Sequence, residues 1–390
     1  MKIILHIGQS KTGTSAIQDF LTRHRKQLAE RGILYPSPRV HGLPIDFGNH
    51  NPLADSLAGV VRYPYLTADE YFSQFFASAR RINAKMMIIS AEHFFGGQPR
   101  PWNVSSEAEY FLRYRQKVES LCRHLKGHEV SIVVYLRPQV DWISSNISQT
   151  IAVGGVVHQS NIFVDDRSYY EKYKFLLKYC DKLDIWSDVC QPRQFAVVPY
   201  VRNKLFENSS VSDFLFRCGL SDMFRDMRVS EVSANESLSR EYLEIKKDLN
   251  SIPRSHSEAR AIVHCLKKLS RRSNLGTTYR LDPEVVVDLE SYVAEDNLRL
   301  SRTYLNGQEL FVAKAAYRGG ELKPLGDATL ARARSAFDRE YRRPSTRLLA
   351  FRHTILEFLR KRVPPAHAAL HQVKRFRRRL MGKRVSARSS

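Results

Sequence analysis

A glycine loop lies between an apolar run and a helical pattern within the first twenty or so residues. Residues 2–7 form a short, largely apolar run that is rich in β-branched side chains, and Gly8 and Gly13 follow it. From Ser15 onward the apolar residues recur at helical spacing. This order predicts a strand, a loop and a helix. Because such a loop directs backbone N–H groups and a helix N-terminus at one point, we expect it to bind an anion, and phosphate is the expected one.

The loop differs from that of nucleoside-triphosphate-binding proteins in the place of its lysine. In those proteins four residues separate two glycines, and a lysine directly follows the second glycine. Here the glycines keep that spacing, but Thr14 takes the place of the lysine, which lies inside the loop as Lys11. A Mg²⁺-bound triphosphate also requires a carboxylate at a neighbouring strand end, whereas the strand predicted before Arg137 ends in that arginine. The pattern favours a phosphate ester neutralised by side-chain cations rather than by a metal.

Two separated motifs resemble those of sulfotransferases that use 3′-phosphoadenosine 5′-phosphosulfate (PAPS), in particular bacterial members that modify carbohydrates. Lys11-Thr12-Gly13-Thr14-Ser15 resembles the 5′-phosphosulfate loop of the family. Arg137, followed eight residues later by Ser145, resembles its 3′-phosphate motif, although Ile147 stands where the family often has an aromatic residue. The resemblance implies PAPS as the sulfuryl donor and no metal. It also implies a set of cofactor-binding residues: Lys11, Thr12, Gly13, Thr14, Ser15, Arg137 and Ser145.

Sulfuryl transfer needs a cation at the leaving phosphate and a general base at the acceptor hydroxyl. Lys11 is the expected cation. Glu92 follows an apolar run at residues 85–90, so we expect it at the carboxyl edge of a sheet, where ligands bind. The segment around it resembles the one that carries the catalytic glutamate in the glycan-modifying branch of the family. We predict Glu92 as the base, with His93 as the alternative because the small-molecule branch uses a histidine there, and with a structural carboxylate as a third interpretation.

Alternating strand and helix patterns predict an α/β fold. The predicted strands include residues 85–90, 130–136 and 195–200, and the predicted helices are residues 15–31, 107–125, 211–220 and a long helix that begins after Asp282. Residues 32–51 are rich in Pro and Gly and are expected to form a loop over the substrate cleft. We expect a P-loop-like, three-layer sulfotransferase domain with a central, mainly parallel sheet over residues 1–312. Residues 313–390 are expected to be a basic, helical or partly disordered extension.

Most of the positive charge lies at the C-terminal end. The net charge is +22, and residues 341–390 contain fifteen Lys or Arg and a single acid, Glu357. Within residues 347–363 the apolar side chains gather largely on one side of a helix. Such a segment fits either an anionic membrane surface or a helix packed on the main domain. The segment lacks the interleaved aromatic residues of a stacking platform, which does not favour nucleic acid as a partner.

The sequence predicts a cytoplasmic protein, held at the inner membrane face if the basic segment binds lipid. No run approaches the roughly 20 apolar residues of a membrane span, and the short first run leads straight into the glycine loop, which is unlike a signal peptide. The five cysteines are scattered and odd in number, so we expect reduced thiols. No His or Cys cluster has metal-ligand spacing.

These features lead to one main functional hypothesis and two alternatives. The main hypothesis is transfer of a sulfuryl group from PAPS to a hydroxyl of a carbohydrate or glycolipid. The first alternative is a nucleotide-dependent kinase of the phosphate-loop class, which Thr14 disfavours. The second is a catalytically inactive module that tethers the chain to a membrane or polyanion.

Overall fold

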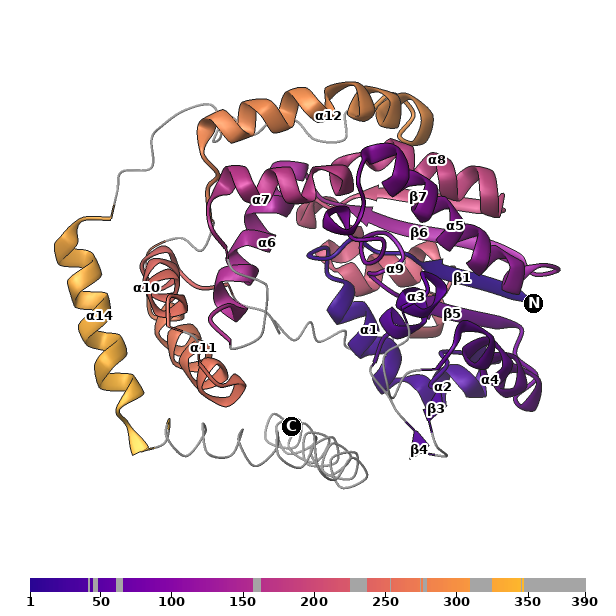
Figure 1. Cartoon of the computed structure of the whole chain (residues 1–390). Helices are drawn as coiled ribbons and strands as arrows, with labels where there is room; N and C mark the ends of the chain where they lie inside the picture. Colours follow the sequence, from indigo (N-terminus) through magenta and orange to yellow (C-terminus); the bar gives the residue numbers. More distant parts are fainter. Residues whose placement is uncertain are drawn as a thin grey trace. The chain divides into compact units, whose positions relative to one another are not determined.

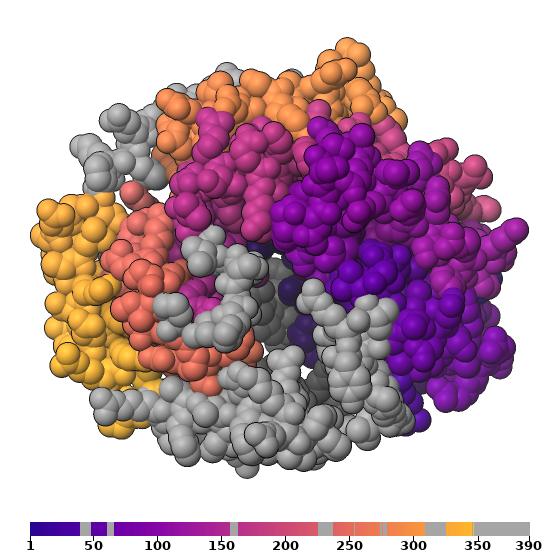
Figure 2. All heavy atoms as spheres, viewed as in Figure 1, coloured from indigo at the N-terminus to yellow at the C-terminus, as the bar shows by residue number. Residues whose placement is uncertain are grey.

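The structure, a computed structural model, describes residues 1–40, 43–44, 48–60, 66–156, 163–224, 237–252, 254–273, 275, 279–308, 325–344 and 346. Figures 1 and 2 show the remaining residues in grey. The basic segment predicted at residues 347–363 lies outside the described residues, as does most of the extension predicted at 313–390. In the part of the chain that is described, no helix has the length and apolarity needed to cross a membrane.

Strands and helices follow one another as far as β7 (Gln194–Pro199), and the described elements after it are helices (Figure 1). The strands are β1 (Lys2–His6), β2 (Ile33–Leu34), β3 (Arg39–Val40), β4 (Leu43–Pro44), β5 (Met86–Ser90), β6 (Glu129–Leu136) and β7 (Gln194–Pro199). The α-helices are α1 (Thr14–Arg23), α2 (Arg25–Glu30), α3 (Asn51–Leu57), α4 (Ala68–Arg81), α5 (Glu107–Leu125), α6 (Gln139–Val153), α7 (Asp166–Tyr173), α8 (Tyr179–Cys190), α9 (Ser210–Arg217), α10 (Arg240–Asn250), α11 (His256–Ser270), α12 (Pro283–Tyr304) and α14 (Asp327–Tyr341). The short 3₁₀ helices are η1 (Pro101–Asn103), η2 (Lys174–Leu177), η3 (Arg202–Lys204), η4 (Phe206–Asn208) and η5 (Asp222–Phe224).

Within the described residues, five strands form one all-parallel sheet in the order β2-β5-β1-β6-β7. On one face, Ile4, Ile88 and Val133 pack in a core with residues of α1 and α9. The alternate residues Leu5 and Ile89 are buried as well, so both faces of the sheet are covered. Strands buried on both faces have continuous apolar sequences, which is why these runs could be recognised. The predicted α/β fold with a parallel sheet is confirmed, and the arrangement is consistent with three layers.

The predicted elements differ from the observed ones at two places near the N-terminus. The helix predicted over residues 15–31 is two helices, because it is interrupted at His24. The ring Nδ1 of His24 lies 2.9 Å from the Phe20 carbonyl oxygen. The region predicted as loop at residues 32–51 includes the edge strand β2, because Ile33 and Leu34 pair with β5. By contrast, α5 has the predicted bounds.

The chain divides into two compact units. Unit 1 comprises Met1–Asn146, Val164–Asn235 and Arg280–Glu321, and it contains the parallel sheet. Unit 2 comprises Ile147–Phe163, Glu236–Tyr279 and Leu322–Ser390, and its helices α10, α11 and α14 pack on one another. The predicted boundary at residue 312 placed α10 and α11 in the main domain. A boundary drawn along the sequence could not show this grouping, because it depends on packing between segments far apart in the chain.

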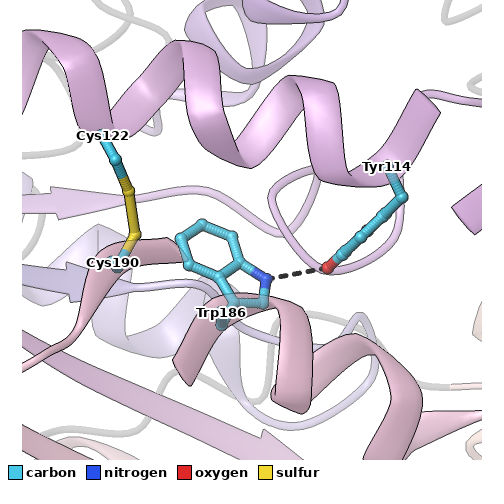
Figure 3. Close-up of a disulfide and its surroundings, with 4 residues drawn as sticks. All are labelled: Tyr114, Cys122, Trp186 and Cys190. Carbon is cyan, nitrogen blue, oxygen red and sulfur yellow. Dashed lines mark hydrogen bonds between the residues drawn. A yellow bond between two sulfur atoms is a disulfide. The ribbon is translucent and has the colours of Figure 1, made fainter. Parts of the chain in front are cut away.

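The prediction of reduced thiols is wrong for two of the five cysteines. Cys122 in α5 and Cys190 in α8 form a disulfide, with their Cα atoms 5.7 Å apart (Figure 3). The two helices pack against each other, and beside the disulfide the Trp186 indole donates a hydrogen bond of 2.9 Å to the Tyr114 hydroxyl. The cysteines are 68 residues apart, so their spacing gave no sign of the pairing. The other three cysteines carry free, buried thiols.

Candidate functional site

The carboxyl ends of three adjacent strands meet at the glycine loop. The central strand β1 lies between β5 and β6, and His6 at its end is in register with Ser90 of β5 and Val133 of β6. The chain passes to β5 on one side of β1 and to β6 on the other, and this kind of switch point is where open α/β sheets bind ligands. The residues after β1 and β5 therefore start from neighbouring points, whereas β6 continues past Val133 to Leu136, and its end meets the loop through the bond from Arg137 to Gln9.

The loop forms a concave group of backbone donors at the start of α1. Lys11 and Gly13 have φ angles of 69° and 79°, in the left-handed region. Among the hydrogen bonds between described residues, the backbone N–H groups of Thr12, Gly13, Thr14 and Ser15 have no acceptor. Successive free N–H groups at a helix N-terminus are the donors that bind a phosphate or sulfate oxygen. The predicted anion loop thus has the required geometry.

The two threonines of the loop fix its shape rather than extend its donor set. The hydroxyl groups of Thr12 and Thr14 donate hydrogen bonds of 2.6 and 3.1 Å to the carbonyl oxygen of Gln9. Both threonines are buried, whereas Ser15 is exposed. The Ser15 hydroxyl is therefore the accessible one of the three.

The side chain of Gln9 joins the loop to the end of β6. Its Oε1 accepts a hydrogen bond of 2.8 Å from the backbone N–H of Arg137, and its Nε2 donates to the hydroxyl of Tyr179 at 2.5 Å. That hydroxyl in turn donates to the carbonyl oxygen of Arg137 at 3.1 Å. Sequence reasoning missed Gln9 and Tyr179, because a glutamine in a loop and a tyrosine in a helix carry no signal of their own. Together they hold the backbone of Arg137 beside the loop.

The structure brings Arg137 to the loop but does not join it to Ser145. The Arg137 side chain is half-buried, and among the described residues no carboxylate lies within ion-pair distance of it. A partly buried guanidinium without a counter-ion suits a bound anion. Ser145 is half-buried in α6, and no hydrogen bond between described residues links it to Arg137. The pairing of these two residues at one phosphate stays a prediction.

Glu92 lies in a turn that is bonded to the end of β1. The backbone N–H of Ala91 donates to the His6 carbonyl at 3.0 Å, and that of Phe95 donates to the Ile7 carbonyl at 3.2 Å. Burial raises the pKa of the Glu92 carboxyl above its ordinary value, while the charges of His93 and Lys11 oppose this rise. The influence of Lys11 on this pKa means that the predicted cation and base lie within electrostatic range of each other.

His93, the alternative base, is oriented by a carboxylate. Its Nδ1 lies 2.8 Å from Oδ1 of Asp55 in α3, and its side chain is 30% exposed. With Nδ1 as the donor, Nε2 is left as the acceptor, as a general base requires. The structure therefore supports both interpretations of this turn. In the described part of the chain, no group of three or more His, Cys, Asp or Glu could hold a metal ion.

Gly13 is the position in the loop where a side chain does not fit. A Cβ atom there would lie 2.1 Å from Oγ and 2.6 Å from Cβ of Ser210, the first residue of α9. We expect Gly13→Ala to lower the free energy of unfolding by about 1–3 kcal/mol through the overlap and by about 1–2 kcal/mol through its positive φ. Thermal unfolding measures the change.

The double variant Gly13→Ala/Ser210→Gly is the matched control for this prediction. It removes the overlapping side chain, so the backbone term at Gly13, the intrinsic cost of the new glycine in α9 and the loss of the Ser210 side-chain contacts, including the one of 3.5 Å with the Tyr200 hydroxyl, should remain, and the single variant Ser210→Gly measures the last two. A Gly13→Ala variant that is as stable as the wild type would contradict the close approach of the loop to α9.

No family model matches this sequence, and no curated protein or solved structure is significantly similar to it.

Proposed function

We propose that this protein is a sulfotransferase that moves a sulfuryl group from PAPS to a hydroxyl of a carbohydrate or glycolipid. The observation that carries the proposal is the meeting of three features at one edge of the sheet. These are the unpaired N–H groups of the glycine loop, the Arg137 backbone held beside that loop, and the turn with Glu92 within electrostatic range of Lys11. The resemblance of the two sequence motifs to those of PAPS-dependent enzymes supports the same conclusion.

In this proposal the loop binds the donor end of the cofactor. The N–H groups of residues 12–15 hold the 5′-phosphate, and Lys11 stabilises the negative charge that builds on the bridging oxygen as it leaves. Arg137 offers two parallel N–H donors to the 3′-phosphate, with Ser145 as a further donor. The bound cofactor supplies the sulfuryl group.

Glu92 acts on the acceptor. Its carboxylate takes the proton of the acceptor hydroxyl as the oxygen forms a bond to sulfur and the bond from sulfur to the phosphate oxygen breaks. A carboxyl whose pKa is raised by burial is a stronger base than an ordinary glutamate, which favours this proton transfer. His93, oriented by Asp55, is the alternative base at the same turn.

A pair of cations around one exposed aromatic side chain supports an acceptor with negative charge. Trp102 follows the Glu92 turn in the sequence, lies in η1 and is 40% exposed. Arg100 and Lys172 lie over its ring, at 5.3 and 4.7 Å from the centroid, and in the described residues neither has a carboxylate within ion-pair distance. Because these cations cover the ring, the cluster offers positive charge rather than a stacking face, and it suits a sugar that carries acidic groups. The basic segment at residues 347–363 would hold the enzyme at an anionic membrane surface.

Calorimetric titration with 3′-phosphoadenosine 5′-phosphate tests the proposal, with ATP plus Mg²⁺ as the comparison ligand. We expect the bisphosphate to bind tightly and Arg137→Ala to weaken it on the order of 10²-fold, because a charge-assisted bidentate contact is lost. Arg113→Ala is the control, since Arg113 is 52% exposed and pairs with Glu109 on α5.

Each other outcome points to one of the alternatives. Binding of ATP with Mg²⁺ but not of the bisphosphate would indicate the kinase. Binding of neither ligand would indicate the tethering module.

A further inference from the structure

Two buried lysines hold the turn that carries the proposed base, and we propose that Lys117 and Lys182 are positioning residues for Glu92. They bind four backbone carbonyl groups, those of His93, Phe94, Phe95 and Gln98, and so set where the Glu92 carboxylate lies relative to Lys11. This inference rests on the proposed function and adds two residues to it that touch neither substrate.

Lys117 lies in α5 with its side chain turned into the core, and the residue is 2% exposed. Its Nζ donates hydrogen bonds to the carbonyl oxygens of His93, Phe94 and Gln98, at 3.1, 2.8 and 2.7 Å. It also lies 4.4 Å from the centroid of the Tyr114 ring. An ammonium group has three N–H donors, so these three carbonyls use all of them.

Lys182 approaches the same turn from α8, and it is 1% exposed. Its Nζ donates to the carbonyl oxygens of Phe95 and Leu176, at 3.4 and 2.7 Å. It also lies 3.8 Å from the centroid of the Phe95 ring. The helices α5 and α8 that carry the two lysines pack side by side and are joined by the disulfide (Figure 3).

The number of acceptors assigns the protonation states of the pair. Burial lowers the pKa of Lys117 to about 7 and that of Lys182 well below its ordinary value, and the charge of Lys117 lowers the latter further. A neutral amine has two N–H donors, which matches the two acceptors of Lys182, and an ammonium group has three, which matches the three acceptors of Lys117. Two cations side by side in the core are thereby avoided.

Burying the two amines costs stability, and what the protein gains in return is a fixed position of the turn. Within the described residues Lys117 forms no ion pair with a carboxylate, although the charge of Asp55 raises its pKa somewhat, and burying a charge without a paired one costs several kcal/mol. An apolar side chain at either position would fill the core more cheaply, provided that the carbonyl groups of the turn faced water instead. The lysines thus keep the carbonyl groups of the turn directed inward.

The turn is held from both sides as a result. Its N–H groups at Ala91 and Phe95 bind the end of β1, and its carbonyl groups at His93, Phe94 and Phe95 bind the two lysines. Glu92 therefore has a backbone position fixed relative to the anion loop. Fixing a reacting group to within about 1 Å is worth on the order of 10²-fold in rate.

The test compares Lys117→Met and Lys117→Arg in the full chain with Lys126→Met, an exposed lysine just after α5. Methionine keeps the length and loses the donors, and arginine keeps donors but displaces the turn. For both Lys117 variants we expect kcat for transfer of radiolabelled sulfuryl from PAPS to a panel of oligosaccharides to fall about 10–10²-fold. The affinity for 3′-phosphoadenosine 5′-phosphate should stay unchanged, because the loop is a separate segment.

A second readout is the pH profile of kcat, which a merely structural role would not move. Loosening the turn exposes Glu92 and so removes part of the burial that raises its pKa. The acid limb of the profile, the low-pH side on which kcat falls as the base is protonated, should therefore move toward lower pH in the Lys117 variants. If Lys117→Met does not fold, the test uses Lys117→Arg. Arginine keeps a buried cation at this position, so a lysine that contributed only to stability could be replaced by it without loss of kcat.

Wild-type kcat in a folded Lys117 variant would overturn the inference and leave the proposed function intact. Wild-type protein that neither binds the bisphosphate nor transfers sulfuryl groups would overturn both.

Discussion

Replacing Lys11 with alanine should reduce the rate of sulfuryl transfer by about 10²–10³-fold, the effect of removing one group that stabilises charge in a transition state. Lys11 lies within electrostatic range of Glu92. Its own φ of 69° is in the left-handed region, and the N–H groups without an acceptor follow it directly in the loop. The affinity for 3′-phosphoadenosine 5′-phosphate should fall much less, because those N–H groups remain. Single-turnover transfer from radiolabelled PAPS to the oligosaccharide panel, with calorimetry of the bisphosphate, measures both quantities.

The matched control is Lys26→Ala, since Lys26 in α2 has a side chain that is 91% exposed and a long ion pair of 3.8 Å to Glu30. We expect this variant to behave as the wild type. Unchanged transfer by Lys11→Ala would remove the leaving-group role from the loop and with it the central claim of the proposed function.

The second large effect is expected for Glu92→Gln, which should lower kcat by about 10²–10⁴-fold, the usual contribution of a general base. Glutamine keeps the shape of the side chain but cannot take up the proton, so affinity for the bisphosphate should be retained. The same assay provides the measurement. A variant with wild-type kcat would assign Glu92 to the third interpretation, a structural carboxylate.

The pH dependence of the wild type follows from the same carboxyl group. The base must be ionised, so kcat falls as the pH drops through the pKa of Glu92. Because burial raises that pKa, the acid limb should lie above the pH range of an ordinary glutamate. In Glu92→Gln this limb should disappear from the residual activity.

His93→Asn and Asp55→Asn separate the two candidate bases. If Glu92 is the base, these variants should keep most of the activity, and the acid limb should stay. If His93 is the base, both should lose activity, because Asp55 orients its ring through the contact of 2.8 Å at Nδ1. Glu92→Gln would then keep an acid limb set by the imidazole.

The sequence was sufficient to predict the strands, helices and turns whose conformation depends on residues close together in the chain. The central strands β1, β5 and β6 are buried on both faces, so each has a largely apolar sequence, and the helical spacing of apolar residues predicted α5 over Glu107–Leu125. The glycine spacing located the loop between β1 and α1 for the same reason, since the turn depends on local backbone conformation. In these cases the information lies within a short window of the chain.

Contacts between distant residues were not predictable in this way. The bond from Arg137 to Gln9 spans 128 residues, and nothing near either residue indicates it. The disulfide and the grouping of α10 with α14 depend on the same kind of contact. Lys117 is different, because it falls on the buried stripe of α5 with Tyr114 and Leu121. A lysine on an apolar helix face is a signal that could have been noticed.

The two backbone bonds between the Glu92 turn and the end of β1 have a consequence for how the enzyme would choose its substrates. In the proposed function the donor loop and the base would both be attached to the end of β1, because the Glu92 turn bonds to the carbonyl groups of His6 and Ile7, directly before the loop. The distance between leaving group and base is then a property of the sheet and does not adapt to the acceptor. An acceptor must bring its hydroxyl to a point that is already fixed, and discrimination among acceptors falls to the segments that surround that point.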